Sequence, residues 1–236
     1  MKPQIFITVC ATVVLVSAVA LAAPAAGPYL LSPTDFDPAR LLPPPPSEGS
    51  AAAKSELEEI LRIEKNRTPA RLERAKSDDT TENASIFAEA IGPGFDLKSL
   101  PATAKMFADI RREERRAAAL AKVYFKRQRP WIVEAAIQSC TREDAPDSSY
   151  PSGHATMGYS MAFVLAGIVP EKAQAVLARA DEYAESRLVC GMHFRRDIEA
   201  GHVLGTAVAL QLLNNAAFKA EYELAAAELR QALKSH

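Results

Sequence analysis

Apolar residues recur at helical spacing along most of this chain, and this repetition limits the fold more than any other feature. Proline or glycine separates several of the repeating segments, and Gly92-Pro93-Gly94 is a strong helix stop. No segment shows the apolar–polar alternation of a half-buried strand, and the alanine content favours helices. The sequence therefore predicts an all-α fold, with helices over 55–66, 69–76, 83–91, 99–126, 154–170, 171–188, 194–214 and 219–233.

Residues 1–22 have the three parts of a secretory signal peptide. Lys2 supplies a positive charge, residues 5–21 form an apolar core, and Ala20-Leu21-Ala22 is a small-residue cleavage site. The apolar core is almost long enough to span a bilayer, so a retained anchor is the alternative. We expect export, with cleavage leaving a periplasmic or secreted protein without a membrane segment.

Residues 23–50 are rich in proline, with four consecutive prolines at 43–46. Such a segment is predicted to be extended and non-helical. Its apolar residues allow either a flexible tail or an arm lying on the domain. Residues 51–236 then form one globular domain, because a chain of 236 residues with 48% hydrophobic content can bury a sizeable core.

The charge balance gives no reason to expect nucleic acid or an anionic membrane as a partner, since the formal net charge is −1. No group of His, Cys, Asp and Glu has the spacing of metal ligands, so we expect no metal and no cofactor. The run RREERR at 111–116 is typical of a solvated helix face with i,i+4 ion pairs.

The hexapeptide SYPSGH at 149–154 has the composition of an anion site at a helix start. Pro151 favours an extended entry, and Ser152 is a good N-cap for the apolar run that follows. A helix beginning here offers free N–H groups to an anion, and Gly153 leaves room beside the backbone. His154 can give or take a proton near neutral pH. A surface histidine in a loop is the alternative.

Basic residues precede this segment. Lys122 and Arg129 are seven residues apart, which predicts two turns of one helix with both cations on the same face. Pro130 marks the end of that helix. Ordinary surface cations are the alternative.

A second histidine follows in SRLVCGMHFRRD at 186–197, which also contributes the cation Arg187. If the segment is helical, His193 and Asp197 are neighbours at i and i+4, and the carboxylate can hold one imidazole nitrogen. The other nitrogen is then a directed nucleophile. Cations, a helix N-terminus and two histidines together indicate phosphoryl transfer.

In this order, K-x6-RP, PSGH and SR-x5-H-x3-D resemble the signature of the PAP2 (type 2 phosphatidic acid phosphatase) superfamily. Within it the chain is most similar to the bacterial class A non-specific acid phosphatases, from about Tyr29 to the C-terminus. The resemblance implies a compact helical bundle of the acid phosphatase–vanadium haloperoxidase type, with the proline-rich arm packed over the fold.

The resemblance also implies a role for each matched residue. His193 would attack phosphorus and form a phosphohistidine, Asp197 would orient it, and His154 would protonate the leaving alkoxide and then activate water. The phosphate oxygens would be held by the remaining matched residues, Lys122, Arg129, Ser152, Gly153 and Arg187. His202 lies outside the motifs and receives no role.

Cys140 and Cys190 remain after removal of the leader, and each flanks a segment of the site. Paired cysteines in exported proteins are often bridged, so we expect a disulfide. Two buried thiols are the alternative.

We therefore expect a metal-independent acid phosphatase that hydrolyses small-molecule phosphomonoesters, with phosphotransferase capacity and a homo-oligomeric state. A vanadium-dependent haloperoxidase shares this pocket and is one alternative. A non-catalytic phosphate-binding protein is another, but it has no need of the His193–Asp197 pair. A membrane lipid phosphatase lacks support, because the chain has no set of transmembrane segments.

Overall fold

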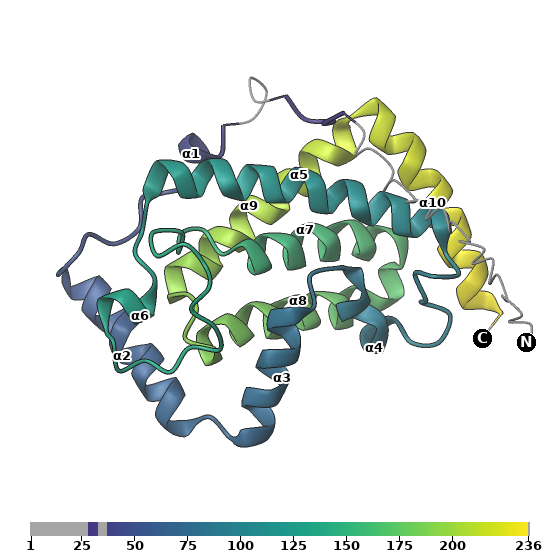
Figure 1. The fold of residues 1–236 in the computed structure, drawn as a ribbon. Helices are drawn as coiled ribbons and strands as arrows, with labels where there is room; N and C mark the ends of the chain where they lie inside the picture. Colours follow the sequence, from purple (N-terminus) through teal and green to yellow (C-terminus); the bar gives the residue numbers. More distant parts are fainter. Residues whose placement is uncertain (1–27, 33–36, 236) are drawn as a thin grey trace, which may run out of the picture.

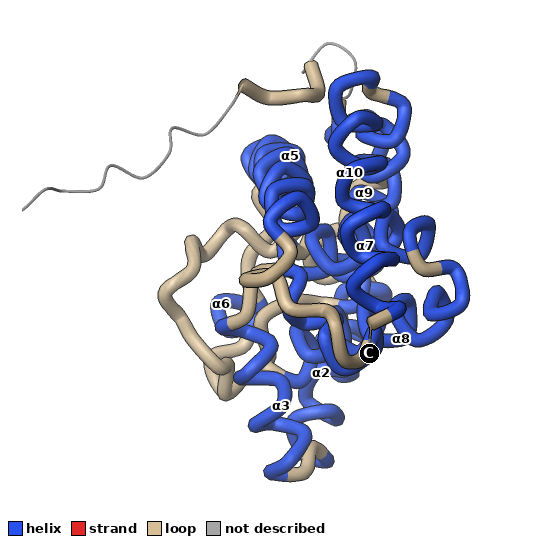
Figure 2. The backbone as a smooth tube through the Cα atoms, turned by 90° about the vertical axis from the view of Figure 1, so that its right-hand side faces the viewer, coloured by secondary structure: helices blue, strands red, loops and turns tan. Residues whose placement is uncertain are grey.

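The computed structural model describes residues 28–32 and 37–235 (Figure 1). The predicted signal peptide lies outside these residues. Within them the chain consists of helices and connecting segments without a strand (Figure 2). The all-α prediction is confirmed.

The predicted helices are present, with changed boundaries. Helix α2 begins four residues early because the Ser50 hydroxyl accepts from the Ala53 N–H at 3.2 Å. Helix α3 runs past the predicted end at Lys76, to Thr80. The helices are α1 (Pro38–Leu41), α2 (Ala51–Asn66), α3 (Pro69–Thr80), α4 (Ala88–Ile91), α5 (Pro101–Phe125), α6 (Pro130–Val133), α7 (Gly153–Ile168), α8 (Ala173–Val189), α9 (Arg195–Asn214) and α10 (Ala216–Lys234), with 3₁₀ turns at Ala84–Phe87 and Pro170–Lys172.

Helix α7 lies in the middle of the bundle and packs against α5, α8 and α9 (Figure 1). It is apolar on nearly all sides, as expected of a helix surrounded by others, and most of its residues are buried. Helix α10 packs on α5 and α9, and α3 packs on α8. The N-terminus of α7 lies beside the C-terminal ends of α5 and α8, so residues from these three helices meet there.

The described part of the arm lies on α5 and α9. The Leu30 N–H donates to Glu113 Oε1 at 2.6 Å, and Leu31 and Leu42 are buried in the core. The prediction that this segment contains no helix is wrong, because α1 forms a single turn. Pro38 is its first residue, a position where the missing N–H has no helical partner to lose.

Helices α7 and α9 approach closely at two glycines of α9. A Cβ atom on Gly205 would lie 2.4 Å from the Thr156 carbonyl oxygen, and one on Gly201 would lie 2.8 Å from the Ser152 carbonyl oxygen. The neighbouring atoms are backbone and cannot turn away as a side chain does. The start of α7 is therefore fixed by the contact with α9.

We expect Gly205→Ala to destabilise the protein by about 1–3 kcal/mol, because the added methyl group forces the two backbones apart. Urea unfolding followed by circular dichroism measures this. Gly167→Ala is the matched control, since its Cβ would meet only the tip of the Tyr222 side chain, at 3.0 Å. An equally stable Gly205→Ala protein would contradict the close packing.

Candidate active site

Lys122 and Arg129 come from two different elements, so the prediction of one shared helix face is wrong. Helix α5 ends at Phe125, and Lys126 takes the left-handed conformation with φ 48°. Pro130 disfavours helix for the residue before it, and Arg129 is extended as the residue preceding α6. The chain reversal between them still brings both side chains to one cavity.

Arg129 is held in place by the connection between α6 and α7. Its side chain is 2% exposed, and its Nη1 donates to the Met192 carbonyl oxygen at 3.0 Å. Nη2 donates to Ser148 Oγ at 3.0 Å and pairs with Asp144 Oδ2 at 3.0 Å. Such fixed, planar donors suit the oxygens of a phosphate.

The predicted helix start is present at the N-terminus of α7. Ser152 caps it by accepting from the Ala155 N–H at 3.3 Å, and its own N–H donates to the Asp197 carbonyl oxygen at 2.9 Å. A Cβ on Gly153 would lie 3.8 Å from Lys122 Nζ. The ammonium group therefore stands directly beside the N-terminus of α7, where both favour an anion.

His193 lies before α9, so it does not share a helix with Asp197, but the predicted proximity of the two side chains is confirmed, with Asp197 Oδ2 3.5 Å from His193 Nδ1. Helix α9 begins at Arg195, and the imidazole Nδ1 lies 2.7 Å from the Ser149 carbonyl oxygen. A carbonyl oxygen can only accept, so Nδ1 carries the proton and Nε2 keeps its lone pair. Nε2 lies 2.9 Å from Arg129 Nη1.

Asp197 is linked to His193 mainly through Ser149. Its Oδ2 is 3.5 Å from His193 Nδ1 but accepts from Ser149 Oγ at 2.5 Å and from the Phe194 N–H at 2.8 Å. Its Oδ1 accepts from Arg127 Nη1 at 2.6 Å. Burial raises the pKa of Asp197 to about 6, against the opposing effect of Arg127.

The surroundings keep His193 neutral. Burial, and then repulsion by Arg129, Lys122 and Arg187, lowers the pKa of His193 well below its ordinary value. Burial and the nearby Arg129 also lower the pKa of Lys122, to about 8. Burial and the surrounding cationic groups therefore both favour the unprotonated imidazole.

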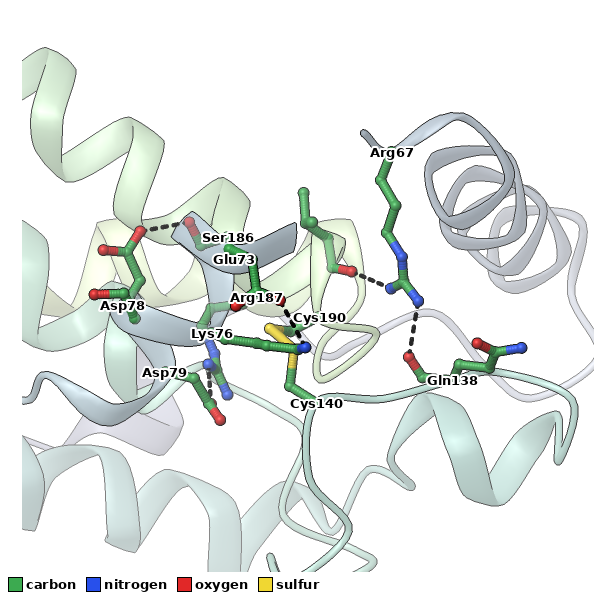
Figure 3. The surroundings of a disulfide bond; sticks show 12 residues. Arg67, Glu73, Lys76, Asp78, Asp79, Gln138, Cys140, Ser186, Arg187 and Cys190 are labelled. Carbon is green, nitrogen blue, oxygen red and sulfur yellow. Dashed lines mark hydrogen bonds and ion pairs between the residues drawn. A yellow bond between two sulfur atoms is a disulfide. The ribbon is translucent and has the colours of Figure 1, made fainter. Parts of the chain in front are cut away.

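Arg187 and His154 meet the C-terminal end of α3, which the sequence analysis did not connect to the site. Arg187, 1% exposed, forms an ion pair with Asp79, and Asp78 binds Ser186 (Figure 3). His154 Nε2 lies 3.0 Å from the Asp79 carbonyl oxygen and 3.6 Å from Glu82 Oε1.

One feature of the sequence could have predicted a role for Asp78 and Asp79. Acidic residues at the C-terminal end of a helix oppose its dipole, so Asp78 and Asp79 at the end of α3 need cations from elsewhere.

The surroundings of His154 disfavour its charged form. Burial, and then repulsion by Arg187, lowers the pKa of His154 well below its ordinary value.

A cavity of 230 Å³ opens over these groups. The interpretation of RREERR as a solvated face is wrong, because Glu113 and Glu114 are 1% and 0% exposed. Three residues of that run line the cavity, since α5 turns this face toward the site. The lining residues are Glu82, Arg111, Glu114, Arg115, Ala118, Ala119, Lys122, Arg129, Asp144, Gly153, His154 and His193.

Cys140 and Cys190 are joined by a disulfide (Figure 3). The Cys140 N–H also donates to the Cys190 carbonyl oxygen at 2.9 Å. The bridge ties the connection that holds Arg129 to the turn that carries His193. At that turn Gly191 has φ +61°, and a Cβ there would lie 2.7 Å from Ile137 Cγ2.

His202 lies apart from the cavity. Its ring stacks on Tyr159 with 3.8 Å between ring centroids.

No group of three or more His, Cys, Asp and Glu among residues 28–32 and 37–235 is arranged to hold a metal ion. Over the same residues, no helix has the length and apolar character needed to cross a membrane.

Comparison with known proteins assigns the class. The PAP2 superfamily model matches residues 115–220. An acid phosphatase of Zymomonas mobilis is 32% identical over 84% of this chain and 78% of its own length. Non-specific acid phosphatases of Providencia stuartii and Salmonella typhi are 30% and 32% identical, over 87% and 75% of this chain and 86% and 74% of theirs.

A solved structure shares the fold. The transmembrane PAP2-type phosphatidylglycerolphosphate phosphatase of Bacillus subtilis superimposes with a TM-score of 0.52 at 18% identity, over 70% of this chain and 85% of that one. The family model and the acid phosphatase relatives show that the chain belongs to the PAP2 superfamily. Its relatives place it among the acid phosphatases, and it is a phosphatase.

The raised pKa of the buried Glu114 carboxyl should make the stability of the protein depend on pH. Burial raises the pKa of Glu114 to about 8 despite the nearby Arg111, whereas the unfolded chain releases this proton near about pH 4.3. Between these values the native state binds more protons, so the free energy of unfolding falls as pH rises. Glu114→Gln cannot titrate, and we expect a flatter curve from urea unfolding between about pH 4 and 8.

Asp197 titrates in the same direction, so part of the slope remains in that variant. Glu58→Gln, an exposed change on α2, is the matched control and keeps the wild-type slope. Parallel curves for the wild type and Glu114→Gln would contradict the role of the buried carboxyl.

Proposed function

We propose that this phosphatase hydrolyses phosphomonoesters through a phosphohistidine on His193. The observation that carries the proposal is the hydrogen-bonded state of that side chain. Nδ1 is tied to the Ser149 carbonyl oxygen at 2.7 Å, so Nε2 keeps its lone pair and lies 2.9 Å from Arg129 Nη1 at the wall of the cationic cavity. A neutral, oriented nitrogen beside fixed positive charge is what attack on an anionic phosphate requires.

Binding of the phosphate uses donors from three segments. Lys122 comes from α5, Arg129 from the turn before α6, and Arg187 from the end of α8. The Gly153 N–H and the Ser152 hydroxyl add neutral donors at the start of α7. These groups stabilise the negative charge on the phosphate oxygens as phosphorus becomes five-coordinate. Such stabilisation of the transition state by preorganised charges is usually the largest contribution to the rate enhancement.

In the first step His193 Nε2 forms a bond to phosphorus while the ester P–O bond breaks. The leaving oxygen takes a proton from His154. In the second step water attacks phosphorus, gives its proton to His154, and the P–N bond breaks to release inorganic phosphate. An alcohol in place of water gives phosphotransfer by the same path.

His154 must carry a proton for the first step. The hydrogen bond between Nε2 and the Asp79 carbonyl oxygen, at 3.0 Å, favours the protonated form. Negative charge from a bound phosphate also opposes the repulsion by Arg187 that lowers the pKa of His154. Substrate binding therefore favours the protonated state of His154 that the first step requires.

Export is part of the proposal. The predicted signal peptide and the Cys140–Cys190 disulfide both suit an oxidising compartment. The periplasm or the external medium is thus the expected location, and the homo-oligomeric state remains a prediction.

We expect phenyl phosphate hydrolysis to survive dialysis against EDTA, because Lys122, Arg129 and Arg187 supply the positive charge. The KM should rise above about pH 8, where Lys122 loses its proton. Steady-state kinetics from pH 4 to 10, with and without added Mg²⁺, test both points. Activity lost on chelation and restored by a divalent ion would overturn the metal-free mechanism.

The two histidines are separated by His154→Ala and His193→Ala. Without His154, cleavage of an alkyl phosphate should fall by roughly 10²–10⁴, because the basic alkoxide leaves without a proton. Nitrophenolate is a weak base, so phosphorylation of His193 by nitrophenyl phosphate should persist while attack by water becomes slow. Rapid mixing should then show a burst of nitrophenol near one per site, with acid-labile phosphate on the protein.

His193→Ala is the matched variant and should show neither burst nor turnover with either ester. An equal loss for both esters in His154→Ala, without a burst, would mean that His154 serves binding and not proton transfer.

A further inference from the structure

The cavity extends beyond the phosphate-binding residues along one face of α5. Arg111, Arg115 and Lys122 all line it, and Ala118 and Ala119 lie between the last two. Seven residues separate Arg115 from Lys122, which is about 10 Å along the helix axis. The small alanines leave the space between the two cations open.

Arg115 and Lys122 share a second property. Neither forms an ion pair with a carboxylate among residues 28–32 and 37–235, whereas Arg129 and Arg187 pair with Asp144 and Asp79. Lys122 is accounted for by the phosphate of the ester. Arg115 is exposed and remains a cation on the cavity wall without a use in the proposed reaction.

Arg111 adds to the charge at this end of the cavity. It pairs with Glu82 on one side and with the fully buried Glu114 on the other. The two pairs fix the guanidinium one helical turn from Arg115. Because burial raises the pKa of Glu114 to about 8, that carboxyl is largely protonated in mildly acidic solution. The carboxylates that then remain charged on the cavity wall are Glu82 and Asp144, and Asp144 is paired with Arg129.

We propose that Arg115, supported by Arg111, forms a second anion subsite, which selects phosphomonoesters whose alcohol carries another anionic group several bonds from the reacting phosphate. The inference rests on the proposed function, because the first phosphate lies at His193. The spacing along α5 favours two anionic groups that are separated by several bonds over two directly linked phosphoryl groups. A sugar or diol with a phosphate at each end has the required form.

Binding and turnover test the subsite separately. Non-hydrolysable alkane bisphosphonates of increasing chain length are compared by calorimetry with the monophosphonates of the same length. We expect the bisphosphonates to bind about tenfold more tightly at an intermediate length, as for one charge-assisted contact. Hydrolysis of the corresponding diol bisphosphates and monophosphates should show the same preference in kcat/KM. A carboxyalkyl phosphate shows whether a carboxylate replaces the second phosphate.

Arg115→Gln should remove the preference, and Arg115→Glu should reverse it. The matched control is Arg62→Gln, an exposed arginine on α2 that does not line the cavity, and it should keep the wild-type ratio. Equal binding of both ligand classes by the wild type, or an unchanged ratio in Arg115→Gln, would overturn the subsite. Preferential bisphosphonate binding without hydrolysis of any ester would instead overturn the proposed function and leave the subsite standing.

Discussion

The carboxylate of Asp197 is the interaction on which the geometry of the site depends. It accepts hydrogen bonds from Ser149, from the Phe194 N–H and from Arg127, which belong to three separate segments. The backbone carbonyl oxygen of the same residue accepts from Ser152. One residue at the start of α9 therefore positions the turn before α7, the carbonyl oxygen that holds His193, and the end of α5. Such a buried carboxylate is costly unless every partner is present, so these segments are ordered together.

Close packing makes that arrangement possible. Gly201 and Gly205 allow α9 to lie against the first turns of α7, and the Cys140–Cys190 bridge restrains the connection that carries Arg129. The cations consequently meet without a helix in common. Arg129 and Arg187 are paired with carboxylates, whereas Lys122 lies beside the N-terminus of α7, where the two positive charges together favour an anion.

Helix α5 buries two acidic side chains within its charged run. Glu113 and Glu114 follow one another in a run that looks fully solvated, yet the structure buries both. Glu113 accepts from the arm at Leu30, and Glu114 holds Arg111 at the cavity wall. The charged run thus has two sides, one attaching the N-terminal arm and the other shaping the outer part of the site.

The sequence by itself determined the helical class, the capped start of α7 at Ser152, and five of the residues that line the cavity, Lys122, Arg129, Gly153, His154 and His193. These depend on local preferences and on residue chemistry, which can be read along the chain. Only the tertiary structure decided that Arg129 lies beyond the end of α5, that the Ser149 carbonyl oxygen holds His193, that Glu82 and Glu114 line the cavity, and that Asp79 contacts Arg187 and His154. Those contacts link residues far apart in sequence, and their partners are chosen by packing, which no local pattern records.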